Sequence, residues 1–181
     1  MKNFTRITGV LFGLAIVLAF ANPDKKINKL VSKIWKNQEA TLTQVDLPDT
    51  LAGDITQLNK IWADGELIGY ACYTTAYGCQ VGGCAAPSNG ASTAYETFDY
   101  IVIYDVNLSI LQVDIANYGG QYGYEICRAK WLSQFNGSTT GFALNENIDG
   151  ISGATVSATY LIKDLNGLGQ TLKELKVNEF I

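Results

Sequence analysis

The chain has 181 residues, with 13 lysines and arginines, 17 aspartates and glutamates, four cysteines and no histidine. The lack of histidine excludes Ser-His-Asp and Cys-His nucleophile arrangements, and it removes the imidazole ligands of the usual zinc sites. Any redox or catalytic chemistry must therefore come from carboxylates, hydroxyls, thiols or a cofactor. A net charge of −4 without basic runs argues against nucleic acid or an anionic membrane as a partner.

The N-terminus has the pattern of a secretory signal peptide. Lys2 and Arg6 precede the apolar run 7–20, which is shorter than the roughly 20 residues of a membrane span. Ala19-Phe20-Ala21 then matches a small-x-small cleavage site. We predict that residues 1–21 are removed, with an uncleaved anchor as the alternative. Cleavage leaves 160 residues with 11 basic and 17 acidic side chains, a net charge of −6, in an exported, periplasmic or extracellular protein without a stable membrane anchor.

The first half of the mature chain reads as a helix followed by a hairpin. Apolar residues recur at spacings of three and four over 24–38, which predicts an amphipathic helix. Turn-forming residues make 42–54 irregular. An Asp-Gly turn favours a hairpin between strands at 57–62 and 66–74. The Gly-, Ser- and Ala-rich stretch 77–95 is predicted to be a long loop.

A second strand pair follows. Residues 98–104 and 109–116 are rich in β-branched and aromatic side chains, which favours two strands joined by a short turn. The Gly- and Tyr-rich stretch 117–124 is predicted to be a loop, and 125–135 a short helix.

Helices complete the chain at 154–165, ending near Gly167, and at 171–177. Because strands pair locally and do not alternate with helices, we predict an α+β fold with an antiparallel sheet of hairpins packed against helices. In this interpretation, 22–56 is an N-terminal helix with an irregular segment, and 57–181 is one functional domain.

The strongest local pattern is Asp-Gly-Ile-Ser-Gly-Ala-Thr-Val-Ser at 149–157, where a loop becomes a helix. Asp149 or Ser152 is placed to cap the helix, and Gly153 permits a tight turn. Thr155 then falls in the first turn, where backbone N–H groups and the helix dipole favour an anion. The alternative is an ordinary capped helix whose small residues serve close packing.

Residues 149–155 resemble the D-x-x-S/T-G-A-T signature of the FMN-binding domain family, which includes flavin-carrying components of the sodium-pumping NADH:quinone reductase and of the Rnf electron-transport complex. Residues 64–70 are similar to the early hairpin of that family, with its DG-x-x-x-G-Y pattern. Residues 98–116 resemble its central strand pair, and 131–137 its segment ending in QF-x-G. The resemblance extends over roughly 57–165.

The resemblance implies a covalent cofactor. In the family, a flavin transferase takes FMN from FAD and links its phosphate to the last threonine of the motif, which is Thr155 here. The neighbouring motif residues would complete the cofactor site: Asp149, Ser152, Gly153, Ala154 and Ser157. The implied function is electron transfer, more than catalysis on a substrate of its own, and the implied partners are the flavin transferase and redox donor and acceptor proteins.

One loop departs from the family pattern. The family often carries E-T-P-G near the isoalloxazine ring, whereas this chain has Tyr-Gly-Gly-Gln-Tyr-Gly-Tyr-Glu at 118–125. Tyr118, Tyr122 and Tyr124 are candidates for stacking on a flavin, because aromatic faces pack well against a flat ring. They are equally consistent with ordinary core or surface tyrosines.

Four cysteines in an exported chain favour two disulfides among Cys72, Cys79, Cys84 and Cys127. Of the three connectivities, the pairs Cys79–Cys84 and Cys72–Cys127 are attractive because they would tie the long loop to the sheet and to the 125–135 helix. A Cys₄ zinc or iron–sulfur site and a redox dithiol are alternatives, but their C-x-x-C spacing is missing. We therefore predict no metal site.

Two other functions are compatible with the same residues. The first alternative is a module that binds FMN or another phosphate ligand without a covalent bond. The second is a disulfide-stabilised exported structural or interaction protein in which Thr155 merely begins a helix. The acidic residues Asp99, Asp105 and Asp114 are explained by exposed strand faces, so no catalytic residue is predicted.

Overall fold

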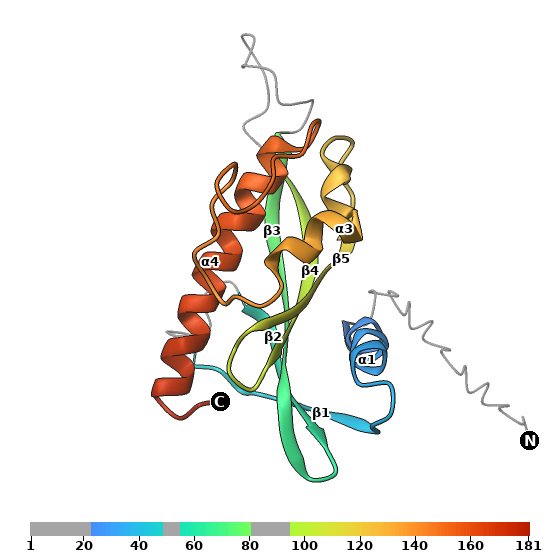
Figure 1. Cartoon of the computed structure of the whole chain (residues 1–181), viewed down its shortest axis with the longest axis vertical. Helices are drawn as coiled ribbons and strands as arrows, with labels where there is room; N and C mark the ends of the chain where they lie inside the picture. Colours follow the sequence, from blue (N-terminus) through green and yellow to red (C-terminus); the bar gives the residue numbers. More distant parts are fainter. Residues whose placement is uncertain (1–22, 49–54, 81–94) are drawn as a thin grey trace, which may run out of the picture.

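Five antiparallel strands form one sheet whose spatial order, β1-β2-β3-β4-β5, is the order of the chain. The computed structural model describes residues 23–48, 55–80 and 95–181. Helices pack against the sheet, so the predicted α+β class with an antiparallel sheet is confirmed (Figure 1). The strands run as follows: β1 Ala40–Gln44, β2 Ile55–Ala63, β3 Glu66–Gln80, β4 Tyr95–Asp105 and β5 Ile110–Tyr118.

The first strands differ from the sequence prediction. The first helix, α1, covers Pro23–Ile34 and ends before residue 38. Part of the segment predicted to be irregular is β1, which is a strand because its backbone pairs with β2 from Ala40 opposite Ala63 to Gln44 opposite Asn59. The hairpin of β2 and β3 is confirmed, but β3 continues to Gln80, into the predicted loop.

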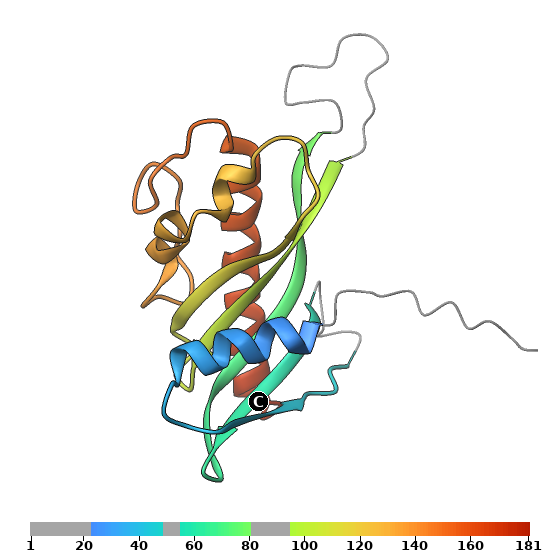
Figure 2. The same ribbon diagram turned by 90° about the vertical axis from the view of Figure 1, so that its right-hand side faces the viewer.

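The sheet is covered on both faces. Alternate residues of β4 point to opposite sides, with Tyr100 and Val102 in one buried cluster and Ile101 and Ile103 in another. Helix α1 supplies Ile27 and two further apolar residues to the second cluster. The long helix α4, Thr155–Val177, lies on the other face (Figure 2).

The connection between β5 and α4 contains three short turns where one helix over 125–135 was predicted. They are η1 Tyr124–Cys127, α3 Ala129–Leu132 and η2 Ser133–Phe135. Arg128 has an extended backbone, with φ −70° and ψ 118°, and this interrupts the helix after η1. Phe135 packs edge-to-face with Trp131 and Phe142, at centroid distances of 5.3 and 5.1 Å.

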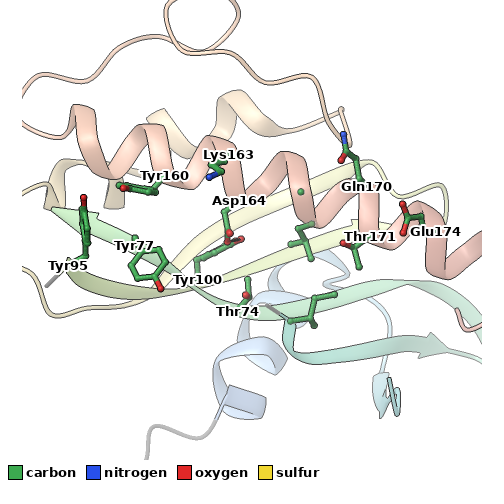
Figure 3. A pocket seen from close by; sticks show the side chains of 13 residues that line it. Thr74, Tyr77, Tyr95, Tyr100, Tyr160, Lys163, Asp164, Gln170, Thr171 and Glu174 are labelled. Carbon is green, nitrogen blue, oxygen red and sulfur yellow. Dashed lines mark hydrogen bonds between the residues drawn. The ribbon is translucent and has the colours of Figure 1, made fainter. Parts of the chain in front are cut away.

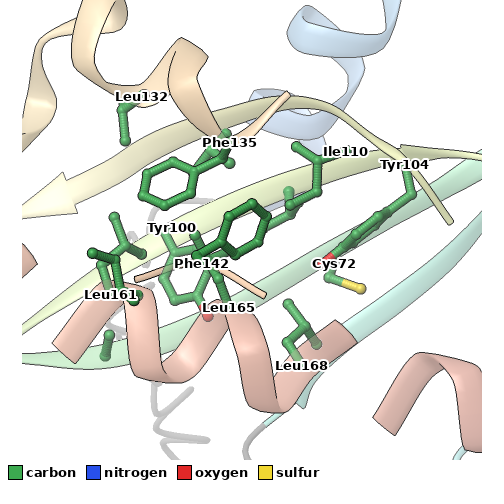
Figure 4. Packing of buried hydrophobic residues seen from close by; sticks show 14 of the residues in the cluster. Cys72, Tyr100, Tyr104, Ile110, Leu132, Phe135, Phe142, Leu161, Leu165 and Leu168 are labelled. Carbon is green, nitrogen blue, oxygen red and sulfur yellow. The ribbon is translucent and has the colours of Figure 1, made fainter. Parts of the chain in front are cut away.

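Helix α4 is continuous over 23 residues, so the prediction of two helices separated near Gly167 is wrong. Its leucines, among them Leu161, Leu165 and Leu168, pack against the sheet (Figure 4). This packing stabilises the helix through Gly167 and Gly169. Close packing explains why position 169 is a glycine: a Cβ there would lie 2.3 Å from the carbonyl oxygen of Thr139. Tertiary packing therefore overrides the weak helix propensity of glycine.

The predicted signal peptide, residues 1–21, lies outside the described residues and stays a prediction. None of the helices in the described ranges is long and apolar enough to cross a membrane. Strand β1, in the predicted N-terminal segment 22–56, pairs with residues 59–63 of the predicted domain 57–181.

We expect Leu165→Ala to lower the free energy of unfolding by about 2–5 kcal/mol, because it leaves a cavity between α4 and the sheet. Leu165 is fully buried, whereas Val177 in the same helix is 82% exposed. Urea unfolding monitored by tryptophan fluorescence measures both. Val177→Ala is the control and should change stability by no more than about 0.5 kcal/mol. Equal losses would contradict the assigned packing face of α4.

A second prediction concerns pH. Partial burial raises the pKa of Asp114 on β5, and Lys33, Lys26 and Lys29 of α1 only partly oppose the effect. The folded protein therefore holds this proton more tightly than the unfolded chain, whose Asp pKa is about 3.9. The resulting stabilisation is complete below that value and is lost as pH rises through the folded pKa.

Asp114→Asn should accordingly reduce the decline of stability as pH rises from about 4, the unfolded-state pKa, towards neutrality. The measurement is the urea midpoint of both proteins at several pH values in that window. Identical pH profiles would show that the carboxyl of Asp114 titrates alike in the folded and unfolded states.

Candidate functional site

The segment 149–157 is a loop that leads directly into α4, as the sequence predicted. Thr155 is the first residue of the helix and its side chain is exposed. Ala154 occupies the N-cap position, and no side chain caps the helix. The predicted capping by Asp149 or Ser152 is therefore wrong. Gly153, with φ +84°, turns the chain after Asp149 and Ser152, so that the residue at the N-cap position is Ala154.

The backbone of Asp149, not its side chain, fixes the start of this loop. Its N–H group donates to Gln134 Oε1 at 2.8 Å, and its carbonyl oxygen accepts from Trp131 Nε1 at 2.8 Å. Both partners belong to the segment that resembles the family's QF-x-G region. The residue itself remains exposed. Segments 131–137 and 149–155 are thus hydrogen-bonded to each other.

Ser157 is a buried junction between α4 and the tyrosine-rich loop. Its side chain is fully buried, and its Oγ lies 3.0 Å from the hydroxyl of Tyr118. Tyr118 also donates a hydrogen bond to the carbonyl oxygen of Tyr122. Gly123, with φ +85°, passes so close that a Cβ would lie 2.4 Å from Ser157 Oγ. The loop therefore contacts the first turn of α4.

Tyr118 has a structural role at this junction. Its ring stacks on Phe98, with a centroid distance of 5.4 Å and an interplanar angle of 28°. Partial burial raises the pKa of its hydroxyl, against the opposing effect of the Ser157 hydrogen bond. Tyr118 therefore stays protonated at neutral pH. One of its faces is occupied, which makes it the least suitable of the three tyrosines for stacking on a ligand.

Tyr122 and Tyr124 differ from Tyr118 because they are exposed, by 49% and 60%. They flank Gly123, the residue that contacts Ser157. Their rings therefore lie on the loop nearest to the beginning of α4, with area available to a ligand.

Two carboxylates beneath glycine backbones were not identified from the sequence. Glu125 Oε1 lies 3.2 Å from the position that a Cβ on Gly153 would take, and its Oε2 is buried without a hydrogen-bond partner. Glu96 lies similarly beneath Gly120 and accepts from the N–H group of Gln121 at 3.2 Å, while its own Oε2 is also buried and unpartnered. The sequence offers one signal for these positions. Gly153 and Gly120 have no side chain, which leaves room for the carboxylates of Glu125 and Glu96.

The cysteine pairing predicted for Cys72 and Cys127 is wrong. Both are free thiols, Cys72 buried in the core beneath α4 and Cys127 exposed on η1. Burial raises the pKa of Cys72, and it is also the largest cause of the raised pKa of Cys127. Cys79 takes part in a disulfide. Cys84 lies outside the described residues, so its pairing with Cys79 stays a prediction.

No protein-family model matches the chain, and no curated protein is significantly similar to it.

Gly123 provides a test of the junction, with Gly137 as a matched control. Both have φ +85°, so alanine costs each about 1–2 kcal/mol in backbone strain. Around Gly137 nothing lies within 4 Å of the added Cβ, whereas at Gly123 it meets Ser157 and Tyr118. Urea unfolding should therefore show a larger loss for Gly123→Ala. Equal losses would mean that the loop does not press against α4.

Proposed function

We propose that this chain is an exported flavoprotein that carries electrons through FMN joined by a phosphoester to Thr155. The observation that carries the proposal is an exposed threonine hydroxyl at the first residue of a 23-residue helix that no side chain caps. The resemblance of residues 149–155 to the flavinylation signature supplies the chemistry.

The beginning of α4 suits a phosphate. Backbone N–H groups in the first turn of a helix have no intrahelical partner, and the helix dipole adds partial positive charge there. Neither Asp149 nor Ser152 competes for these donors through a side-chain cap. A phosphate ester on Thr155 would therefore be stabilised by the backbone at the point of attachment.

The surrounding groups fit the rest of the cofactor. The unpartnered Oε2 of Glu125 is an acceptor for a hydroxyl or ring N–H donor, and desolvation without such a partner is costly. The exposed rings of Tyr122 and Tyr124 offer area to a flat ring. FMN, when bound, supplies one- and two-electron redox chemistry. The protein would hold the cofactor and adjust its potential through burial and hydrogen bonding.

Attachment requires a partner. Thr155 Oγ would form a bond to the FMN phosphorus of FAD as the bond to AMP breaks, with the hydroxyl proton passing to the flavin transferase. A redox donor and an acceptor protein would then exchange electrons with the cofactor. A covalent bond prevents loss of the flavin by diffusion outside the cytoplasm.

We expect the protein exported from its native host to carry the mass of FMN less one water, and Thr155→Val to lose it. Thr159→Val is the matched control: Thr159 lies one turn further along α4, is also exposed, and donates its hydroxyl to the Thr155 carbonyl. It should keep the added mass. Intact-mass spectrometry with flavin absorbance measures both.

Native protein with the bare polypeptide mass and no flavin absorbance would overturn the proposal in favour of a structural or interaction protein. Flavin that acid precipitation releases would instead indicate a module that binds it without a covalent bond. Loss of the added mass in both variants would show that damage to the helix, not removal of the Thr155 acceptor, prevents attachment.

A further inference from the structure

A pocket of about 670 Å³ lies between α4 and residues of β2, β3 and β4 (Figure 3). Its volume falls within the range of small-molecule sites. Thr155 and the tyrosines at 118, 122 and 124 are not among its lining residues. The pocket is therefore lined by other residues than the candidate flavin site, and the proposal made for it does not depend on the proposed function.

Three tyrosines from three different elements form one end of the pocket. Tyr77 of β3, Tyr95 of β4 and Tyr160 of α4 contact one another with ring centroids 5.7–5.9 Å apart, in tilted and edge-to-face arrangements. Tyr77 is 58% and Tyr95 39% exposed. These rings support each other and still present area to the solvent, so they form a preorganised aromatic platform.

Polar side chains continue from this platform along α4. In the middle of the pocket, Tyr100 donates a hydrogen bond to Asp164, and burial is the largest cause of the strongly raised pKa of Tyr100, which keeps this donor protonated. Beyond it lie Gln170, Thr171 and Glu174. At 1.5 Å per residue, the polar wall from Asp164 to Glu174 is about 15 Å long. An elongated ligand would contact both ends.

The charge of the lining narrows the class of ligand. Among the described residues that line the pocket, Lys163 is the single cation, and Asp164 and Glu174 carry carboxylates. A polyanion such as a nucleotide would meet both carboxylates, and a polycation would meet the lysine. A lipid tail would leave the amide and hydroxyl groups without partners, which is unfavourable. A neutral ligand with many donors and acceptors avoids all three penalties.

We propose that this pocket binds a short neutral oligosaccharide. One sugar ring would pack its C–H face on the tyrosine platform, and hydroxyl groups along the chain would exchange hydrogen bonds with Gln170, Thr171 and Glu174. Lysine donates, carboxylates accept, and amide and hydroxyl groups do both, which matches the dual character of sugar hydroxyls.

The test titrates the exported protein with maltotriose, cellotriose and tri-N-acetylchitotriose, followed by calorimetry. At least one trisaccharide should bind. Tyr160→Ala should weaken that binding by about threefold to tenfold, the equivalent of an aromatic contact worth roughly 0.5–1.5 kcal/mol. Because Tyr160 is half-buried, the thermal unfolding of the variant is measured as a check on its fold.

A conservative variant guards against misfolding. Glu174→Gln keeps the shape of the side chain but removes its negative charge, and should weaken binding. Glu146→Gln changes an exposed residue in a turn that does not line the pocket, and should leave binding unchanged. Binding of none of the three sugars would overturn the proposal. So would tighter binding of adenosine or spermidine, or sugar binding that Tyr160→Ala and Glu174→Gln leave unchanged.

Discussion

The packing of α4 against one face of the sheet is the contact on which both proposed sites depend. The helix buries a row of leucines over β3 and β4, and its length places Thr155 at one end and the polar wall of the pocket along its flank. If the helix rotated by one residue, about 100°, it would move every one of these side chains to a different direction. The apolar row therefore determines where the functional groups point.

Elements with local sequence signals were predictable, whereas elements that depend on distant partners were not. The hairpins were predictable because alternation and an Asp-Gly turn are local signals, and the resulting antiparallel sheet follows from them. Strand β1 and the continuity of α4 were not, because each depends on a distant partner. The backbone of β1 becomes a strand only beside β2, and Gly169 is retained in the helix because the Thr139 carbonyl leaves no room for a side chain.

For the candidate site, the sequence identified the motif but not its surroundings. Thr155 was placed correctly at a helix beginning, since Gly and Ser before a helix are a strong signal. The predicted cap was wrong because the positive φ of Gly153 separates Ser152 from the helix. Glu125 was missed because its importance comes from contact with Gly153, 28 residues later in the chain. The Tyr77, Tyr95 and Tyr160 platform is likewise assembled only by the tertiary fold.

The strand order has a consequence for the route to this structure. Each strand pairs with its chain neighbour, so the sheet assembles from short-range contacts, which favours fast folding. The helix that covers the Tyr100 and Val102 side of the sheet, however, is α4, which follows all five strands in the chain. On a chain that emerges N-terminus first, the face of the sheet that packs against the leucines stays uncovered until α4 has emerged. The threonine at the start of α4 therefore emerges before the helix that will hold it in place is complete.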